Sequence, residues 1–147
     1  AACLAQLGNT VVPIDQEAKA LYHCAAVMAS NHMIALADAA AEMLSSCGFD
    51  QESAVKALTP LMRGNISAII ASGPAAALTG PVERNDLNTV AEHLHALERA
   101  DPQTAELYRF LSSRLVKIAC DKHPDRDYTE LKELLTDERK SLKGERQ

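Results

Sequence analysis

The chain has 147 residues, which is enough for one domain with a core of its own. Its apolar content of 47% and charged content of 24% are ordinary for a globular protein. A formal net charge of −5 argues against a nucleic-acid-binding surface, and an aromatic content of 3%, without tryptophan, argues against base stacking.

The first residues have the pattern of a helix end followed by a short strand. Ala1–Leu7 is closed by Gly8, and Thr10–Val12 precedes Pro13. A helix tail and an isolated strand cannot stabilise each other alone. We therefore expect residues 1–13 to be a linker or the end of an upstream domain that contains a sheet, and residues 14–147 to be a separate helical domain.

One long helix is predicted from Asp15 to Gly48, and the domain is expected to be organised around it. Asp15 can cap its first turn, and Gly48 suits the left-handed position after its last turn. The stretch between Lys19 and Asp38 carries no charged residue, which predicts burial on all sides. His23, Ser30, Asn31 and His32 argue against a membrane span, so we expect its own chain and a second copy to cover residues 15–48.

Local signals divide the remaining chain into further helices. Asp50 caps a helix that begins at Gln51, Pro60 starts a new helix or a kink, and Gly73 ends that segment. The proline after Gly73 permits one short helix before a sharp turn at Gly80-Pro81. N-caps follow at Asp86, Asp101 and Asp127, with helix ends at His123 and about Leu142. In the helix from Asp86, the residues predicted to point inward are Val90, Leu94 and Leu97. The helix that starts after Asp101-Pro102 contains Leu107, Tyr108, Leu111, Leu115, Ile118 and Ala119. The expected class is all-α.

The four cysteines, Cys3, Cys24, Cys47 and Cys120, form no C-x-x-C pair. Two of them lie in the long helix, too far apart for a disulfide, so we expect reduced thiols in a cytoplasmic protein. Cys120 and His123 could be half of a zinc site, but no second half follows. The simpler interpretation is a helix-end thiol and a loop histidine, and we predict no metal.

Polar side chains within the uncharged part of the long helix are the one candidate constellation. His23, Val27, Ser30 and Asn31 share one helix face. Either His23 donates to a neighbouring carbonyl and Asn31 pairs across a helix interface, or the two are a proton donor and an amide that orient a carbonyl-type substrate. The chain has no glycine-rich phosphate-binding motif, so it is not expected to bind a nucleotide cofactor alone.

Two stretches, YHCAAVMASNH (residues 22–32) and GPAAALTGPVERND (residues 73–86), carry a family resemblance. They resemble the C-terminal module of Rossmann-like proteins with the domain-of-unknown-function family 2520. This family belongs to the 6-phosphogluconate-dehydrogenase C-terminal-like group, with pyrroline-5-carboxylate reductase and ketopantoate reductase as relatives. Cys24 stands where the pattern leads us to expect alanine. The other supporting pieces are Pro13-Ile14-Asp15, residues 58–63 (LTPLMR) and the helix from Asp86.

The resemblance implies an NAD(P)-binding Rossmann-type domain upstream, which residues 1–13 would end. It also implies a homodimer through the long helix and a small-molecule site in the cleft between the two domains. By position in the family, His23 would be the proton donor and Asn31 the orienting residue. Ser30, Thr79, Gly80 and Pro81 would bind the substrate.

Two functions are therefore expected. The first is the dimerisation and substrate-binding domain of an NAD(P)-dependent oxidoreductase that is not active as this isolated chain. The alternative is a non-catalytic helical dimerisation or protein-interaction module. The polar face of His23, Ser30 and Asn31 favours the first, because a pure dimer seam has little reason to hold three polar groups.

Overall fold

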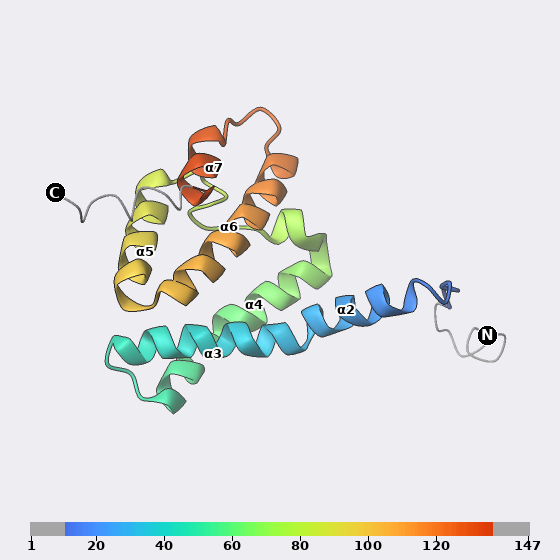
Figure 1. The fold of residues 1–147 in the computed structure, drawn as a ribbon, viewed down its shortest axis with the longest axis horizontal. Coiled ribbons are helices and arrows are strands. Elements are labelled where there is room, and N and C mark those ends of the chain that lie inside the picture. Colours follow the sequence, from blue (N-terminus) through green and yellow to red (C-terminus); the bar gives the residue numbers. More distant parts are fainter. Residues whose placement is uncertain (1–10, 137–147) are drawn as a thin grey trace. The chain divides into compact units, whose positions relative to one another are not determined.

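The structure is a computed structural model that describes residues 11–136, and this part of the chain is helical with no strand. The prediction of an all-α fold is confirmed for these residues. Val11 and Val12, predicted to belong to a strand, have no regular structure, and residues 1–10 lie outside the described part. The helices are α2 (Lys19–Ala29), α3 (Asn31–Ser46), α4 (Gln51–Ala77), α5 (Leu87–Ala100), α6 (Pro102–Lys122) and α7 (Thr129–Thr136) (Figure 1).

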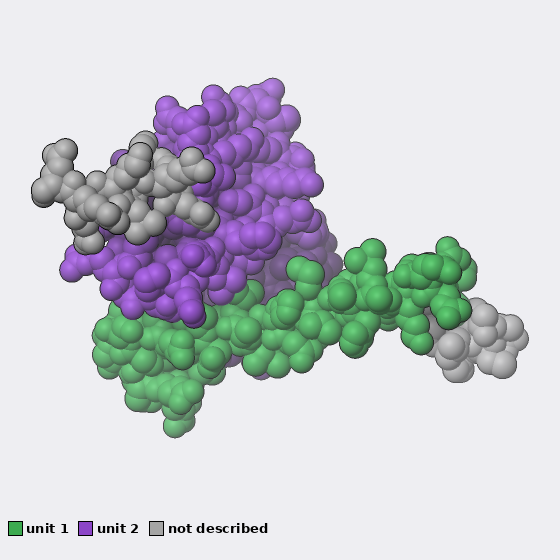
Figure 2. Space-filling model, viewed as in Figure 1, with its two compact units in different colours: residues 1–58 green, residues 59–147 purple. Residues whose placement is uncertain are grey.

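The chain divides into two compact units, residues 1–58 and residues 59–147 (Figure 2). The first unit contains α2, α3 and the start of α4. The second contains the rest of α4 and the helices α5, α6 and α7. The predicted domain boundary at residues 13 and 14 stays a prediction.

The predicted long helix is two helices, because the backbone leaves the helical conformation at Ser30, where φ is −125° and ψ is −75°. The Ser30 hydroxyl donates to the Ala26 carbonyl over 2.7 Å. Such bonding to the carbonyl four residues earlier competes with the backbone ladder and bends helices. The predicted cap at Asp15 is also wrong. Asp15 accepts from the Ala18 N–H through its backbone carbonyl, and α2 begins only at Lys19 without a side-chain cap.

The end of α3 is as predicted. Gly48 has a φ of +97°, which a residue without Cβ adopts at little cost. The Phe49 N–H donates to the Leu44 carbonyl and the Gly48 N–H to the Ser45 carbonyl, which together form a Schellman motif. Asp50 then caps α4 by accepting from the Ser53 N–H over 3.0 Å. These two signals fix the connection between α3 and α4.

Helix α4 continues through Pro60 with helical dihedral angles, so no new helix begins there. Pro60 removes one N–H from the ladder, but it is exposed, so water can satisfy the carbonyl that loses its partner. The break comes at Gly73, with φ +79° and ψ +167°, a conformation that favours glycine. A single helical turn follows from Pro74 to Ala77, as the sequence predicts.

The core lies in the second unit, where α5, α6 and α7 pack against one another (Figure 1). Asp86 and Asp101 cap α5 and α6 through the Thr89 and Gln103 N–H groups, as predicted. Asp127 accepts the N–H of Thr129 at the start of α7 over 2.8 Å. The predicted end of this helix near Leu142 lies outside the described residues. The buried cluster comprises Val82, Val90, Leu94, Val116, Ala119, Tyr128, Leu131 and Leu135.

The burial predicted for the long helix is wrong within this chain. Ala41 is the one buried residue of α2 and α3. Leu107 on α6 is also exposed, at 39%, whereas the smaller Ala105, Ser112 and Val116 are buried. The buried stripe of α6 therefore consists of smaller residues than the sequence indicates, and this permits close packing with its neighbours.

We expect Leu131→Ala to lower the free energy of unfolding of the second unit by about 3 kcal/mol, because Leu131 is fully buried and its loss leaves a cavity. Leu107→Ala, at an exposed position, is the matched control and should cost less than about 1 kcal/mol. Urea unfolding followed by circular dichroism measures both. Equal losses in the two variants would contradict the assigned core.

Candidate functional site

The break between α2 and α3 brings Ser30 and Asn31 together. The Ser30 hydroxyl lies 2.7 Å from the Ala26 carbonyl and 3.0 Å from Asn31 Oδ1. One hydroxyl proton serves only one of these acceptors. If the Asn31 amide is turned by 180°, its Nδ2 donates to the Ser30 oxygen, and both contacts are satisfied.

His23 lies on α2, two helical turns before Asn31, and is exposed. Its side chain forms no hydrogen bond within residues 11–136, so the carbonyl partner considered for it is not among them. Asn31 bonds locally to Ser30 there, without a partner from another helix. In the first unit the three predicted residues are therefore exposed polar groups within the stretch of α2 and α3 that has no charged residue between Lys19 and Asp38.

Thr79, Gly80 and Pro81 belong to the second unit and lie in the loop that joins α4 to α5. Gly80 has a φ of +98°, and the residues that follow it form turns in which the Arg84 N–H donates to the Gly80 carbonyl over 3.1 Å. Thr79 is exposed, whereas Val82 is buried in the core. The predicted turn at Gly80-Pro81 is confirmed.

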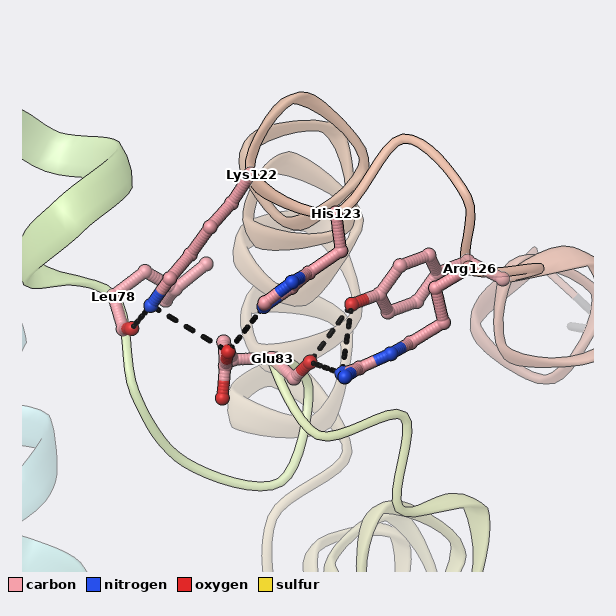
Figure 3. Close-up of polar contacts among 6 residues, drawn as sticks. Leu78, Glu83, Lys122, His123 and Arg126 are labelled. Carbon is pink, nitrogen blue, oxygen red and sulfur yellow. Dashed lines mark hydrogen bonds and ion pairs between the residues drawn. The ribbon is translucent and has the colours of Figure 1, made fainter.

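A set of charged residues holds this loop at Glu83 (Figure 3). The Glu83 carboxylate lies 2.5 Å from His123 Nε2 and 3.5 Å from Lys122 Nζ. Lys122 Nζ also donates to the Leu78 carbonyl over 2.8 Å. The hydrogen bond from His123, followed by the positive charge of Lys122, holds the pKa of Glu83 below its ordinary value.

The backbone carbonyl of Glu83 is also held by hydrogen bonds. It accepts from Arg126 Nη1 and from the Tyr128 hydroxyl, each over 2.7 Å (Figure 3). Tyr128 is 2% exposed and belongs to the core cluster, so this bond anchors the loop to the packed part of the unit. We call Glu83, Lys122, His123, Arg126 and Tyr128 the Glu83 clamp.

A further contact holds the end of the loop. Asn85 has a φ of +59°, which asparagine tolerates better than most residues, and its Nδ2 donates to the Asp127 carbonyl over 2.9 Å. Because Asp127 lies in the connection between α6 and α7 and accepts the N–H of Thr129, this contact joins the loop to that connection.

Sequence reasoning missed the clamp, although one signal pointed to it. The chain is uncharged from Gly64 to Val82, so Glu83 is the first charge after a long apolar stretch. A carboxylate at such a place needs a cationic partner, and the pair Lys122-His123 at the end of a predicted helix is one. His123, considered as a zinc ligand with Cys120, instead contacts Glu83.

Residues 11–136 contain no group of three or more histidine, cysteine or acidic side chains that could hold a metal ion. They do contain a cavity of about 730 Å³ between α5, α6 and α7. An ion pair between Arg109 and Glu98 lies on its wall, and Leu87 and Leu94 line it. None of the predicted site residues line this cavity.

The segment Lys19–Ser46 is long and apolar enough to cross a membrane by length and composition. A core helix of a soluble protein passes the same test, but only 6% of this apolar window is buried. Within this segment the charged residues Asp38 and Glu42 are unfavourable in a lipid core, because charges are costly there.

These features define an all-α chain with an apolar, broken helix in one unit and a clamped loop in the other. A model of the family described as "Domain of unknown function (DUF2520)" matches residues 1–115. The chain belongs to this family. No curated protein and no solved structure matches it. The matched region includes the loop and Glu83, whereas Lys122, His123 and Arg126 come after it.

Proposed function

We propose that this chain is the dimerisation and substrate-binding domain of an NAD(P)-dependent oxidoreductase, in the group that includes pyrroline-5-carboxylate reductase and ketopantoate reductase. The resemblance in residues 22–32 and 73–86 supports this group, and both stretches lie inside the matched region. In the proposal a Rossmann-type domain upstream of this chain carries the cofactor, and the substrate is a small molecule with a carbonyl or related group.

The proposal rests on three polar side chains, His23, Ser30 and Asn31, which lie on α2 and at the break between α2 and α3. The side chains of His23 and Asn31 are exposed. Within residues 11–136, Asn31 contacts only its neighbour Ser30, and His23 has no side-chain hydrogen bond. A helix surface that serves only packing gains nothing from polar groups, which cost free energy when they are buried unpaired. A substrate oxygen is the kind of partner that an imidazole and an amide can share.

The proposed roles follow from the chemistry of each side chain. His23 gives a proton to, or takes one from, a substrate oxygen, which is the commonest role of histidine in catalysis. The amide of Asn31 orients the same group, and Ser30 fixes that amide through its hydroxyl. From the family resemblance, Thr79, Gly80 and Pro81 are proposed to bind the substrate. The nicotinamide on the upstream domain supplies or accepts the hydride when it is bound.

Dimerisation is proposed from the apolar side chains that α2 and α3 expose. Met28 is 64% and Ile34 71% exposed within this chain. Large contiguous apolar surfaces on soluble proteins mark interaction sites. The large exposed apolar residues of the two helices are Leu21, Tyr22, Met28, Met33, Ile34, Leu36 and Met43.

The same apolar surface favours the second candidate, a helical dimerisation or interaction module without catalysis. The two functions differ in what they require of His23 and Asn31. The interaction module needs neither a cofactor-binding domain nor a ligand at these residues. A cofactor titration therefore separates them.

The test is a fluorescence titration of NADPH and NADH with a polypeptide that contains this chain and its native upstream sequence. The 147-residue chain is the control, and it should not bind because it has no glycine-rich phosphate motif. Binding by the longer polypeptide supports the oxidoreductase, and a substrate screen with the bound cofactor follows. Absence of binding in both would overturn the proposal in favour of the interaction module.

A further inference from the structure

We propose that Lys122 and His123 are positioning residues of the proposed substrate site, which they serve by fixing its loop at Leu78 and Glu83, on either side of Thr79–Pro81. This inference rests on the proposed function, because it assigns the loop to substrate binding. It concerns residues that come after the region matched by the family model.

The two anchor points bracket the loop segment that carries the predicted site residues. Leu78 precedes Thr79 directly, and its carbonyl accepts from Lys122 Nζ over 2.8 Å. Glu83 follows Pro81 by two positions, and its carboxylate contacts His123 Nε2 at 2.5 Å and Lys122 Nζ at 3.5 Å. Lys122 therefore touches both sides of the segment, as Figure 3 shows. These contacts therefore fix both ends of the segment.

The charges around the Glu83 carboxylate indicate that the Glu83 clamp does more than fill space in the core. Lys122 is the last residue of α6 and His123 its C-cap, so the carboxylate contacts side chains that come from the negative end of this helix. A carboxylate there is unfavourable unless cations pair with it. The side chains of Glu83, Lys122 and His123 are 16%, 27% and 29% exposed, so the pairing is only partly screened by water.

The stability of the fold does not by itself require the ion pairs of Glu83 with Lys122 and His123. Replacing a largely buried ion pair by apolar residues of similar volume is often neutral or stabilising. Charged pairs with directional hydrogen bonds instead select one arrangement of the backbone. The bonds from Arg126 and Tyr128 to the Glu83 carbonyl have the same effect, because they fix the orientation of the peptide between Glu83 and Arg84.

The first part of the test is amide hydrogen exchange on the 147-residue chain. The N–H groups of Arg84, Asn85 and Asp86 report on the loop, because they donate to the carbonyls of Gly80, Val82 and Pro81. Glu83→Gln keeps the shape and removes the charge. We expect these amides to exchange about tenfold faster in this variant, and the buried α5 amides at Val90 and Leu94 to change less than about twofold.

Two further variants keep this result interpretable if Glu83→Gln folds poorly. Lys122→Met should accelerate exchange of the same amides, and Lys122→Arg should restore most of the protection because it keeps a cation near Glu83. His95→Gln, at an exposed histidine of α5 outside the clamp, is the matched control and should leave the loop unchanged. Unchanged exchange in Glu83→Gln and Lys122→Met, or equal acceleration in α5, would overturn the inference.

The second part uses the polypeptide with its upstream domain and a substrate found in the screen. For His123→Ala we expect KM for that substrate to rise about tenfold with kcat within about twofold of the unmodified protein, because a loosened loop weakens binding rather than chemistry. Unchanged KM together with faster loop exchange would overturn the positioning role while leaving the oxidoreductase intact. Absence of cofactor binding and turnover in the unmodified polypeptide would instead overturn the proposed function and, with it, the role of the loop in substrate binding.

Discussion

Ile34→Glu should convert the dimer that we propose for this chain into a monomer. Ile34 lies on α3 and is 71% exposed within one chain, so the substitution disturbs little inside that chain. In a dimer through α2 and α3 it would place a charge without a partner among apolar side chains. Burying an unpaired charge costs several kcal/mol, so we expect the dimer dissociation constant to rise at least about 10³-fold.

Sedimentation equilibrium of the 147-residue chain measures this change, with circular dichroism to show that the helices persist. Phe110→Glu is the matched control. Phe110 is 76% exposed on α6, outside the proposed surface, and should leave the dissociation constant within about threefold. A monomeric unmodified chain, or an Ile34→Glu variant that still dimerises as tightly, would show that α2 and α3 are not the dimer surface.

The parts of the fold that the sequence predicts correctly depend on interactions between residues close in the chain. Asp50, Asp86 and Asp101 each accept an N–H two or three positions later, and Gly48 ends α3 through bonds to the turn before it. Such signals are complete within a few residues. Tertiary packing has little influence on them, so the sequence alone is enough.

The wrong predictions concern positions where two local conformational preferences compete, or where the extent of burial depends on the rest of the structure. Ser30 was predicted as a polar position on a continuous helix, but its hydroxyl bonds to the Ala26 carbonyl and the helix breaks. Pro60 was predicted to begin a new helix or a kink, and no new helix begins there, because α4 keeps helical dihedral angles. The uncharged stretch from Lys19 to Asp38 predicts burial partly by its own chain and partly by a second copy, and the chain itself buries only Ala41 of α2 and α3.

The candidate site was predictable only in part for the same reason. Residues His23, Ser30 and Asn31 stand out because a polar residue in an apolar helix is visible in the sequence. The clamp joins Glu83 to His123, 40 positions later, and no periodicity or spacing rule connects two such residues. Its position depends on how α6 packs against α5 and α7, which composition does not specify.

His23→Ala should lower kcat of the proposed oxidoreductase by about 10³-fold, within the range for loss of a general acid or base. The expected reason is that the substrate oxygen then has no positioned group to exchange a proton with while the hydride is transferred. Turnover is measured in the polypeptide that carries the upstream domain, at saturating cofactor. Because His23 is exposed within the chain, the substitution should not change folding or cofactor binding.

His32→Ala is the matched control, since His32 is an exposed histidine of α3 that has no role in the proposed mechanism. It should leave kcat within about twofold, and both variants should keep the dimer dissociation constant of the unmodified protein. Asn31→Ala should raise KM as well as lower kcat, because the amide orients the substrate in both the ground state and the transition state. Full turnover in His23→Ala would remove His23 from the mechanism. The proton would then have to come from another group that reaches the substrate, and the break at Ser30 would be a feature of helix packing alone.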